Sequence, residues 1–278
     1  MTYKIIVDSC CDLTFKYKED EHYQIIPLTL QVDNAHMVDD ETFDQKEFLR
    51  LMKKSEKCPK SACPSPEKFK KAYGCEADNI FVVTLSEHLS GTYNSALLGK
   101  NLYIEEFGHK NIAVISSRSA SVGEALIAFK IQQLCEKGCS FEEVAREAVA
   151  FRDGMETLFV LESLENLRKN GRLTGLQAFF ATALNIKPVM YGNKGVIEKL
   201  DQARGINKAL VRMCETAINK ISNTKEKTLG IAHCNCPERA EFVKNEMCKR
   251  AEFKDIYIVD TAGVATLYAY DGGIIMCI

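Results

Sequence analysis

Hydroxyl side chains and a glycine stand together at Ser90, Gly91 and Thr92, and these residue types suit the binding of an anion. They follow an apolar, β-branched run at 80–85 and precede apolar residues at helical spacing over 93–107, which predicts a strand, a tight turn and a helix. The first N–H groups of such a helix lack partners within it and carry the positive end of its dipole. Ser90 and Thr92 could add hydroxyl donors, and Gly91 allows close approach to the backbone. From this local pattern alone, a helix cap is the simpler interpretation.

A second hydroxyl-bearing loop comes earlier in the chain and contains Ser61 and Ser65. Pro64 and Pro66 fix their own φ and restrict the residues before them, so the sequence predicts a rigid loop that leads into a helix over 67–73. Such a loop could hold a hydroxyl in place at little entropic cost. Serine before a helix is also the usual helix cap.

The elements that position these loops alternate between strands and helices up to residue 153. This alternation predicts a parallel sheet with right-handed crossovers, and ligands bind such sheets at the carboxyl ends of the strands. Besides the elements already named, strands or extended runs are expected at 3–7, 24–32 and 111–115, and helices at 44–55, 121–137 and 140–152.

From residue 154 the pattern changes. The turn at 192–195 is rich in glycine and lies between two apolar runs, which predicts a hairpin and hence antiparallel pairing. We therefore expect an α/β domain at 1–153 and an α+β domain with a mixed sheet at 154–278, facing each other across a cleft. Strands are predicted at 157–160, 186–191, 196–200, 228–233 and 255–259, and helices at 164–171, 207–221, 238–250 and from Thr174.

Composition narrows the possible functions. The 278 residues are 46% hydrophobic and 27% charged, which is ordinary for a globular protein, and the net charge is -2. Without a run of Lys or Arg, the sequence gives no reason to expect nucleic acid as a partner. No apolar segment has the length of a membrane span, and the first residues do not resemble a secretory signal, so we expect a cytoplasmic protein.

The chain has 12 cysteines but no CxxC motif. We expect reduced thiols that fill small apolar sites. His233, Cys234 and Cys236 are the residues best suited to a metal, but paired zinc-binding motifs are missing. The sequence therefore predicts neither a metal site nor a cofactor.

Four short segments in this order resemble the motifs of the DegV family of fatty acid-binding proteins. They are 8–13 (DSCCDL), 61–64 (SACP), 89–96 (LSGTYNSA) and 167–173 (LRKNGRL). The second and third are moderately specific alone, whereas four in the right order make a strong resemblance that runs the length of the chain.

The resemblance implies a parallel-sheet, three-layer N-terminal domain and a mixed-sheet, two-layer C-terminal domain. One long-chain fatty acid, such as palmitate, would lie between them, with its carboxylate held by the hydroxyl loops and its tail in an apolar tunnel. Members similar to the fatty acid-binding subunits of bacterial fatty acid kinase present the acid to a kinase, which forms an acyl phosphate. The chain would then be a lipid-binding protein and not itself an enzyme.

The same resemblance assigns roles to particular residues. The hydroxyls of the two loops correspond to Ser61 and Ser90, which would bind the carboxylate together with N–H groups near Gly91 and Thr92. The arginine that the family associates with productive pairing to the kinase corresponds to Arg172.

The chain departs from the family pattern at two places. The first loop usually reads Thr-Ser-Gln, where this chain has Ser-Ala-Cys at 61–63. The C-terminal His-x-Gly-Pro-Gly motif corresponds to 269–273, where Ala269 stands in place of the histidine that would contact the carboxylate. This leaves the prediction of binding intact and weakens that of transfer to a kinase. Tyr268 or Tyr270 could supply a hydroxyl instead.

Candidates for the tunnel wall come from the apolar stretch after Thr174. An apolar helical stripe is more often ordinary core, so each of these residues has a competing structural role. The candidates are Phe179, Phe180, Ala183, Leu184 and Ile186.

Two other functions remain open at the level of sequence. In the first, Ser90 is the nucleophile of an acyl hydrolase or transferase, with His88 or His233 as the base, although no G-x-S-x-G elbow is present. In the second, the helix terminus after Ser90 binds phosphate or another small anion. Neither a Walker loop nor a dinucleotide fingerprint supports the second alternative.

Overall fold

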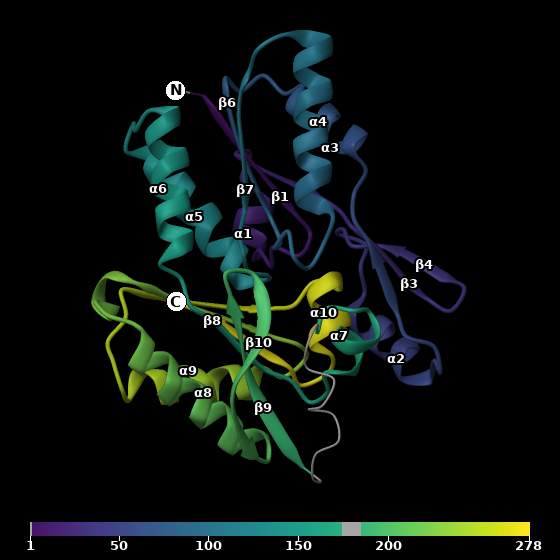
Figure 1. The fold of residues 1–278 in the computed structure, drawn as a ribbon, viewed down its shortest axis with the longest axis vertical. Helices are drawn as coiled ribbons and strands as arrows, with labels where there is room; N and C mark the ends of the chain where they lie inside the picture. Colours follow the sequence, from purple (N-terminus) through teal and green to yellow (C-terminus); the bar gives the residue numbers. More distant parts are fainter. Residues whose placement is uncertain (1, 174–184) are drawn as a thin grey trace.

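The computed structural model describes residues 2–173 and 185–278 (Figure 1). Its first part is built on a parallel sheet of four strands in the order β2-β1-β6-β7, as the alternating pattern predicts. β6 is buried along its whole length, which explains its nearly continuous apolar sequence. The strands are β1 (Tyr3–Asp8), β2 (Tyr23–Ile26), β6 (Asn79–Thr84) and β7 (Asn111–Ser116).

Helices cover both faces of this sheet, so this part has the three layers that were predicted (Figure 1). Successive side chains of a strand point to opposite faces. Ile6 accordingly packs with Phe69, whereas its neighbour Ile5 packs with Ile127. The first face carries α3 (Pro66–Tyr73) and α4 (Thr92–Phe107), and the second carries α5 (Val122–Glu136) and α6 (Phe141–Asp153); a short helix, α1 (Phe15–Lys18), follows β1.

A small antiparallel sheet, in the order β4-β3-β5, corrects two predictions. The extended run at 24–32 is two strands in different sheets, because Pro27 has no N–H and the N–H of Leu28 is bound by the Ser9 hydroxyl at 3.1 Å. The rigid loop after residue 60 begins as a strand, since Ser61 pairs with Leu30. These elements are β3 (Thr29–Val32), β4 (Ala35–Val38), β5 (Lys60–Ala62) and the nearby α2 (Gln45–Lys54), which Asp44 caps.

The last part of the chain forms a mixed sheet of six strands in the order β10-β9-β8-β13-β11-β12. β11 and β12 are parallel and the other pairs are antiparallel, including the predicted hairpin of β9 and β10. α8 (Ile206–Lys220) and α9 (Pro237–Cys248) cover one face. The strands are β8 (Thr157–Val160), β9 (Ile186–Asn193), β10 (Val196–Arg204), β11 (Thr228–His233), β12 (Asp255–Asp260) and β13 (Ile274–Cys277), with a 3₁₀ turn at Thr224–Glu226.

Two short helices lie where the small sheet meets the mixed sheet: α7 (Glu165–Lys169), which was predicted, and α10 (Gly263–Ala269), which was not. The first N–H groups of α10 are bound by Asp39, whose carboxylate oxygens lie 2.6 and 2.8 Å from the nitrogens of Gly263 and Val264. A helix start that depends on a residue more than 200 positions away leaves no local signal in the sequence.

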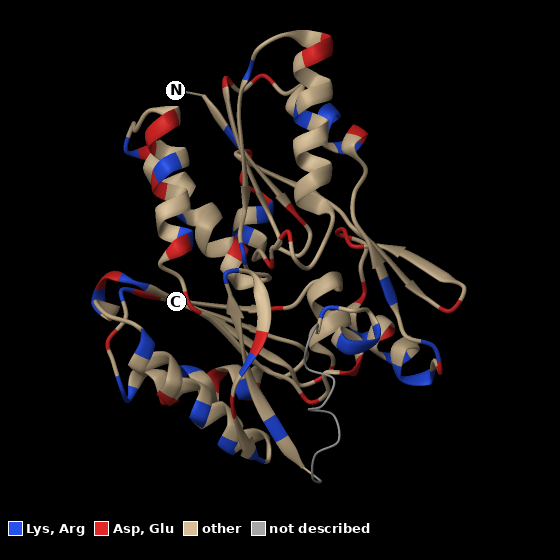
Figure 2. Ribbon diagram, in the orientation of Figure 1, with Lys and Arg blue, Asp and Glu red and all other residues tan. Residues whose placement is uncertain are grey.

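The sheets change at the boundary that the sequence suggested, since α6 ends at Asp153 and β8 begins the mixed sheet. The division into domains 1–153 and 154–278 itself stays a prediction. Figure 2 shows Lys, Arg, Asp and Glu interspersed over the outer helices of both parts. Among the helices of the described ranges, none is long and apolar enough to cross a membrane. The predicted helix from Thr174 falls outside these ranges.

Candidate functional site

An apolar cavity lies where the two large parts of the molecule and the small sheet meet. Leu85 and Leu89 line it from the first part, and Phe159, Ile197 and Ala269 line it from the last part. The cavity itself has a volume of ≈ 90 Å³, within ≈ 830 Å³ of space between atoms that includes open solvent. Pockets that hold small molecules are mostly apolar with few polar groups, and the lining of this cavity has the same character.

Ser61 and Ser90 both line this cavity, although they come from different sheets and loops. Ser61 lies in β5, and its hydroxyl oxygen is 3.0 Å from that of Tyr268. Ser90 lies just before α4, and its hydroxyl oxygen is 2.9 Å from that of Thr92. The structure therefore brings together the two serines that the sequence singled out.

Gly91 and Thr92 support Ser90 and are not among the residues that line the cavity. Thr92 is fully buried, and its N–H donates to the Ser90 hydroxyl at 3.3 Å. A Cβ atom on Gly91 would lie 3.3 Å from the sulfur of Cys63, so Gly91 lets the two hydroxyl loops pack closely. Both residues hold the loops in place, and the direct contact of their N–H groups with a ligand stays a prediction.

Arg172 brings a positive charge to the same end of the cavity. Its Nε donates to the carbonyl of Leu89 at 3.1 Å, and its guanidinium carbon lies 5.6 Å from the ring centre of Tyr268. A second guanidinium nitrogen of Arg172 donates to the carbonyl of Asn170, and within the described ranges Arg172 makes no ion pair with a carboxylate.

Tyr268 and Ala269 come from α10 and also line the cavity. Burial raises the pKa of Tyr268, which keeps its hydroxyl protonated and able to donate. Tyr270, the other tyrosine that was considered, is not among the residues lining the cavity. Four side chains therefore form the polar end of the cavity. Three carry a hydroxyl, namely Ser61, Ser90 and Tyr268, and the fourth is the cationic Arg172.

A family model described as "Uncharacterised protein, DegV family" matches residues 2–277. The chain belongs to the DegV family. A DegV domain-containing protein of Streptococcus pyogenes serotype M1 is 37% identical over 279 residues, which is 99% of each chain.

Solved structures of other DegV proteins share the fold of this chain. A DegV family protein of Ruminococcus gnavus, refined with vaccenic acid, matches with a TM-score of 0.98, 48% identity and full coverage of both chains. The Fatty Acid Kinase (Fak) B3 protein of Streptococcus pneumoniae, solved loaded with linoleic acid, matches with a TM-score of 0.86 and 34% identity, over 100% of this chain and 99% of that one. The α/β plus α+β fold predicted for the chain is confirmed.

Of the tunnel candidates of this DegV protein, only Ile186 lies within the described residues. Ile186 opens β9, where it pairs with Arg204, and it is not among the residues lining the cavity. The other four, Phe179, Phe180, Ala183 and Leu184, lie outside the described residues, so their assignment stays a prediction.

Among the described residues the Ser90 hydroxyl forms hydrogen bonds with Thr92, which does not support the nucleophile hypothesis. His88 is half exposed and its ring is 4.0 Å from Glu87, while His233 is buried beside Asp260 at 3.4 Å. A serine nucleophile needs a base within hydrogen-bond reach. In this DegV protein the surroundings of Ser90 fit a binding role better.

The residues that were suggested for a metal behave as ordinary structure. Cys234 and Cys236 are buried, and the N–H of Cys236 donates to the ring of His233 at 3.4 Å. Among the described residues, the grouping of potential metal ligands is elsewhere, at Asp8, Cys10 and Glu124.

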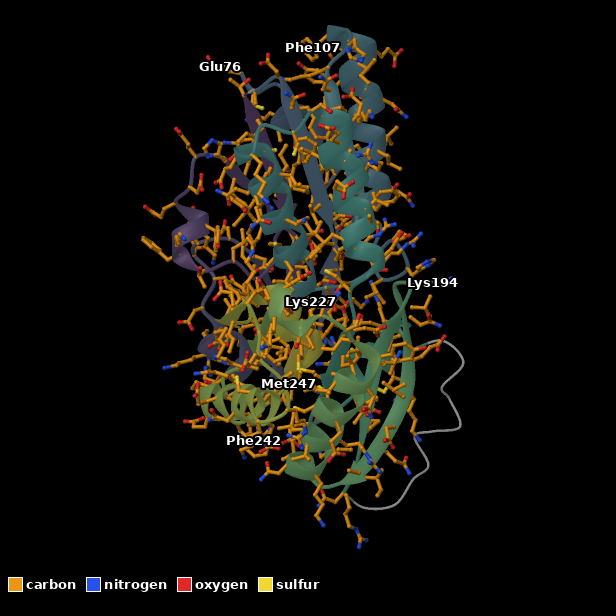
Figure 3. The ribbon with its side chains drawn as sticks, turned by 90° about the vertical axis from the view of Figure 1, so that its left-hand side faces the viewer. Glu76, Phe107, Lys194, Lys227, Phe242 and Met247 are labelled. Atoms are coloured by element: carbon orange, nitrogen blue, oxygen red, sulfur yellow. The ribbon has the colours of Figure 1, made fainter. Side chains whose placement is uncertain are left out.

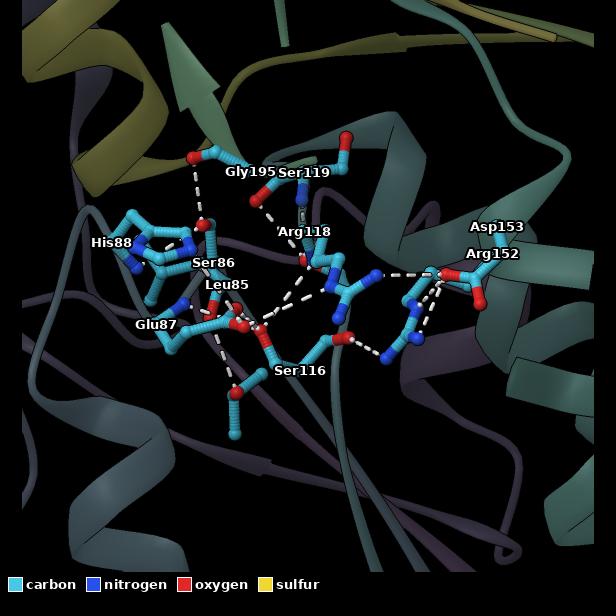
Figure 4. A network of polar contacts seen from close by, with 12 residues as sticks. Leu85, Ser86, Glu87, His88, Ser116, Arg118, Ser119, Arg152, Asp153 and Gly195 are labelled. Atoms are coloured by element: carbon cyan, nitrogen blue, oxygen red, sulfur yellow. Dashed lines mark hydrogen bonds and ion pairs between the residues drawn. The ribbon is translucent and has the colours of Figure 1, made fainter. Parts of the chain in front are cut away.

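The sequence did not indicate that the turn after β7 reaches the cavity, which it does through Arg118 and Ser119. Figure 4 shows Arg118 between two acids: its guanidinium lies 3.8 Å from Glu87 and 3.1 Å from Asp153. The position of Arg118 in the sequence could have indicated this. It follows β7, which lies beside β6, so it lies at the same edge of the sheet as Ser90.

The tip of the β9–β10 hairpin lines the cavity and packs against the turn after β6. The Ser86 hydroxyl donates to the carbonyl of Gly195 at 2.8 Å (Figure 4). Gly195 has φ 92, and a Cβ there would lie 2.5 Å from the Ser86 oxygen, so this contact requires glycine. Figure 3 shows neighbouring Lys194 at the height where the two parts of the molecule meet, whereas Phe107 lies at the far end of α4.

Proposed function

We propose that this protein binds one long-chain fatty acid in the cavity, with the carboxylate held between Ser61 and Ser90. The observation that carries this proposal is the placement of two serines from separate loops at the polar end of one mainly apolar cavity. Solved DegV proteins that carry fatty acids in their crystals have the same fold and support it.

The head group would be bound by neutral donors and one cation. The hydroxyls of Ser61, Ser90 and Tyr268 can each donate to a carboxylate oxygen, and Arg172 adds charge. Hydrogen bonds to a charged group contribute about 1.5–3 kcal/mol each before the cost of removing the carboxylate from water is counted. Tyr268 takes the place of the histidine that this chain lacks, as its hydroxyl already contacts Ser61.

The acyl tail would supply most of the affinity. The rest of the cavity is lined mainly by aliphatic and aromatic side chains, and each methylene removed from water contributes about 0.8 kcal/mol. A tail of many methylenes therefore outweighs the head-group contacts in affinity, while the head-group contacts fix its direction.

A fatty acid kinase would be the partner of such a carrier, acting in the cytoplasm. The structural neighbour named as a Fatty Acid Kinase B3 protein supports this assignment. Arg172, at the head-group end of the cavity, would be the residue through which the carrier pairs productively with the kinase. The carrier would hold the acid without catalysing its phosphorylation.

The test is to identify what the purified protein carries. Recombinant protein is denatured, extracted with organic solvent and analysed by mass spectrometry, and we expect about one long-chain fatty acid per chain. Protein that is free of lipid and takes up no added oleic acid would contradict the proposal. Covalent labelling of Ser90 by an acyl ester probe would support the hydrolase alternative instead.

A further inference from the structure

Potential metal ligands are buried together at the carboxyl end of β1. Asp8, Cys10, Asp12 and Glu124 each expose at most 2% of their surface. Asp8 ends β1, Cys10 and Asp12 lie in the following turn, and Glu124 lies in the first turn of α5. No Lys or Arg of the described chain forms an ion pair with them, although buried charges require a partner.

Glu124 differs from its acidic neighbours in its hydrogen bonding. The Asp8 carboxylate accepts two backbone N–H groups, at 2.8 and 2.9 Å, and the Asp12 carboxylate accepts a backbone N–H and a hydroxyl. Both oxygens of Glu124 are buried and make no hydrogen bond of normal geometry among the described residues, although Asp8 and Cys10 lie beside them. A carboxylate left in this state costs free energy unless a proton or a cation neutralises it.

The spacing of the ligand atoms suits a metal ion. A carboxylate oxygen of Asp8, one of Glu124 and the sulfur of Cys10 all lie within 4.8 Å of one another. A tetrahedral zinc ion with bonds of about 2.0–2.3 Å holds its ligands roughly 3.3–3.8 Å apart, so small side-chain rotations would bring these three atoms onto one ion.

We propose that Asp8, Cys10 and Glu124 form a binding site for a divalent transition-metal ion of the zinc class. The thiolate selects zinc-like ions over magnesium or calcium, which prefer oxygen ligands alone. The ion would give Glu124 the partner that it lacks and would offset most of the negative charge of the ionised ligands. Cys10 also lines the cavity, so the ion would lie in the cavity wall, but its binding requires no fatty acid.

Burial favours the protonated forms of these three groups, whereas a bound cation would favour their ionised forms. Burial raises the pKa of Asp8 to about 7 and the pKa values of Cys10 and Glu124 well above their ordinary ranges. Without metal, a proton on Glu124 is therefore the competing way to neutralise the cluster.

The test uses the full chain, purified without a metal-affinity tag, stripped with a chelator and dialysed. Zinc chloride is added, excess ion is removed, and bound zinc is counted by mass spectrometry. We expect about one tightly bound zinc per chain, and at least roughly tenfold weaker binding in Glu124→Gln and Cys10→Ser. Cys63→Ser, which removes an exposed thiol, is the matched control and should bind zinc like the wild type.

Cobalt replaces zinc as a spectroscopic probe, because a cobalt–thiolate bond gives an intense near-ultraviolet charge-transfer band. This band should appear in the wild type and Cys63→Ser and be absent in Cys10→Ser, and circular dichroism should verify that each variant is folded. If the stripped wild type binds no zinc and shows no thiolate band, the site is a protonated carboxylic acid cluster and the metal proposal is wrong. A band that survives in Cys10→Ser would contradict it equally.

Discussion

Ser61 and Tyr268 lie 207 positions apart in the chain, and their hydroxyl oxygens are 3.0 Å apart at one end of the cavity. The contact joins β5 of the small sheet to α10, which packs beside the mixed sheet. A head group placed here would be held from both parts of the molecule. Ligand binding would therefore hold these two parts together, and separating them would weaken binding.

Removing either loop hydroxyl should weaken fatty acid binding. Ser61→Ala and Ser90→Ala each delete one donor to the carboxylate, and we expect a loss of about 1–2 kcal/mol, or roughly 5- to 30-fold in Kd. Titration of the delipidated variants with oleic acid measures this change.

Ser65→Ala is the matched control for these variants. Ser65 is exposed, makes no side-chain cap hydrogen bond and is not among the residues lining the cavity. Its Kd should equal that of the wild type. If Ser61→Ala and Ser90→Ala also bind oleic acid with the Kd of the wild type, the two loops do not have the assigned role.

Tyr268→Phe removes the hydroxyl and keeps the ring, so it distinguishes the contributions of the two to binding. The phenyl ring should still fill its place in the wall, so the fold and the apolar contacts are kept. We expect a severalfold weaker affinity for oleic acid and little change for the matching alcohol, oleyl alcohol, which lacks the charge. Parallel titrations with both ligands measure this, and an equal loss for the two would show that Tyr268 acts through packing.

The hairpin contact at Ser86 should control ligand exchange. Ser86→Ala removes the hydrogen bond to Gly195, and Gly195→Ala places a Cβ against the same oxygen in an unfavourable backbone conformation. Both variants should release fatty acid faster, Gly195→Ala more so, as stopped-flow transfer to lipid vesicles would show. Unchanged release rates in two folded variants would mean that the hairpin tip does not close the cavity.

Asp39 should be important for stability through α10. Asp39→Asn keeps the shape of the side chain but turns one acceptor of a helix N–H into a donor, so we expect a loss of about 1–3 kcal/mol in the free energy of unfolding. Urea denaturation measures it. Because α10 carries Tyr268, fatty acid affinity should fall as well, and a variant as stable as the wild type would show that the helix does not depend on this cap.

Glu162 should make stability depend on acidity. Burial raises its pKa, but Lys187 and Arg239, each at 2.6 Å, outweigh burial and lower the pKa below its ordinary value of 4.5. A lowered pKa in the folded state means that the stabilisation is complete above pH 4.5 and is lost as pH falls through the folded-state pKa.

The comparison is between the wild type and Glu162→Gln. The variant should be less stable at neutral pH, and the difference should shrink as the solution is acidified below pH 4.5. Urea denaturation across this range measures the difference. If the difference in the free energy of unfolding stays constant or grows on acidification, the ion pairs do not stabilise the protein through the charge of Glu162.

Local patterns in the sequence predicted the elements that depend on near neighbours. The strand–turn–helix unit around Ser90 and the capped helix after Ser140 both formed, because apolar periodicity and capping act over a few residues. The placement of Ser61 and Ser90 at one cavity followed from the family resemblance and not from local pattern.

Features that depend on distant partners were not predictable in the same way. α10 starts on Asp39, and Lys60–Ala62 becomes a strand because β3 offers an edge. Arg118 reaches the cavity because β7 lies beside β6. Glu124 reads as an ordinary helix residue in the sequence, and only the packing of α5 against β1 shows that it is buried among acids.

The most direct test of the central claim is a crystal structure of the protein with bound oleic acid. We predict one ligand in the cavity, with its carboxylate oxygens within hydrogen-bond distance of the hydroxyls of Ser61 and Ser90 and its tail among the apolar residues. A carboxylate bound elsewhere, or a ligand whose methyl end lies at the two serines, would contradict the account.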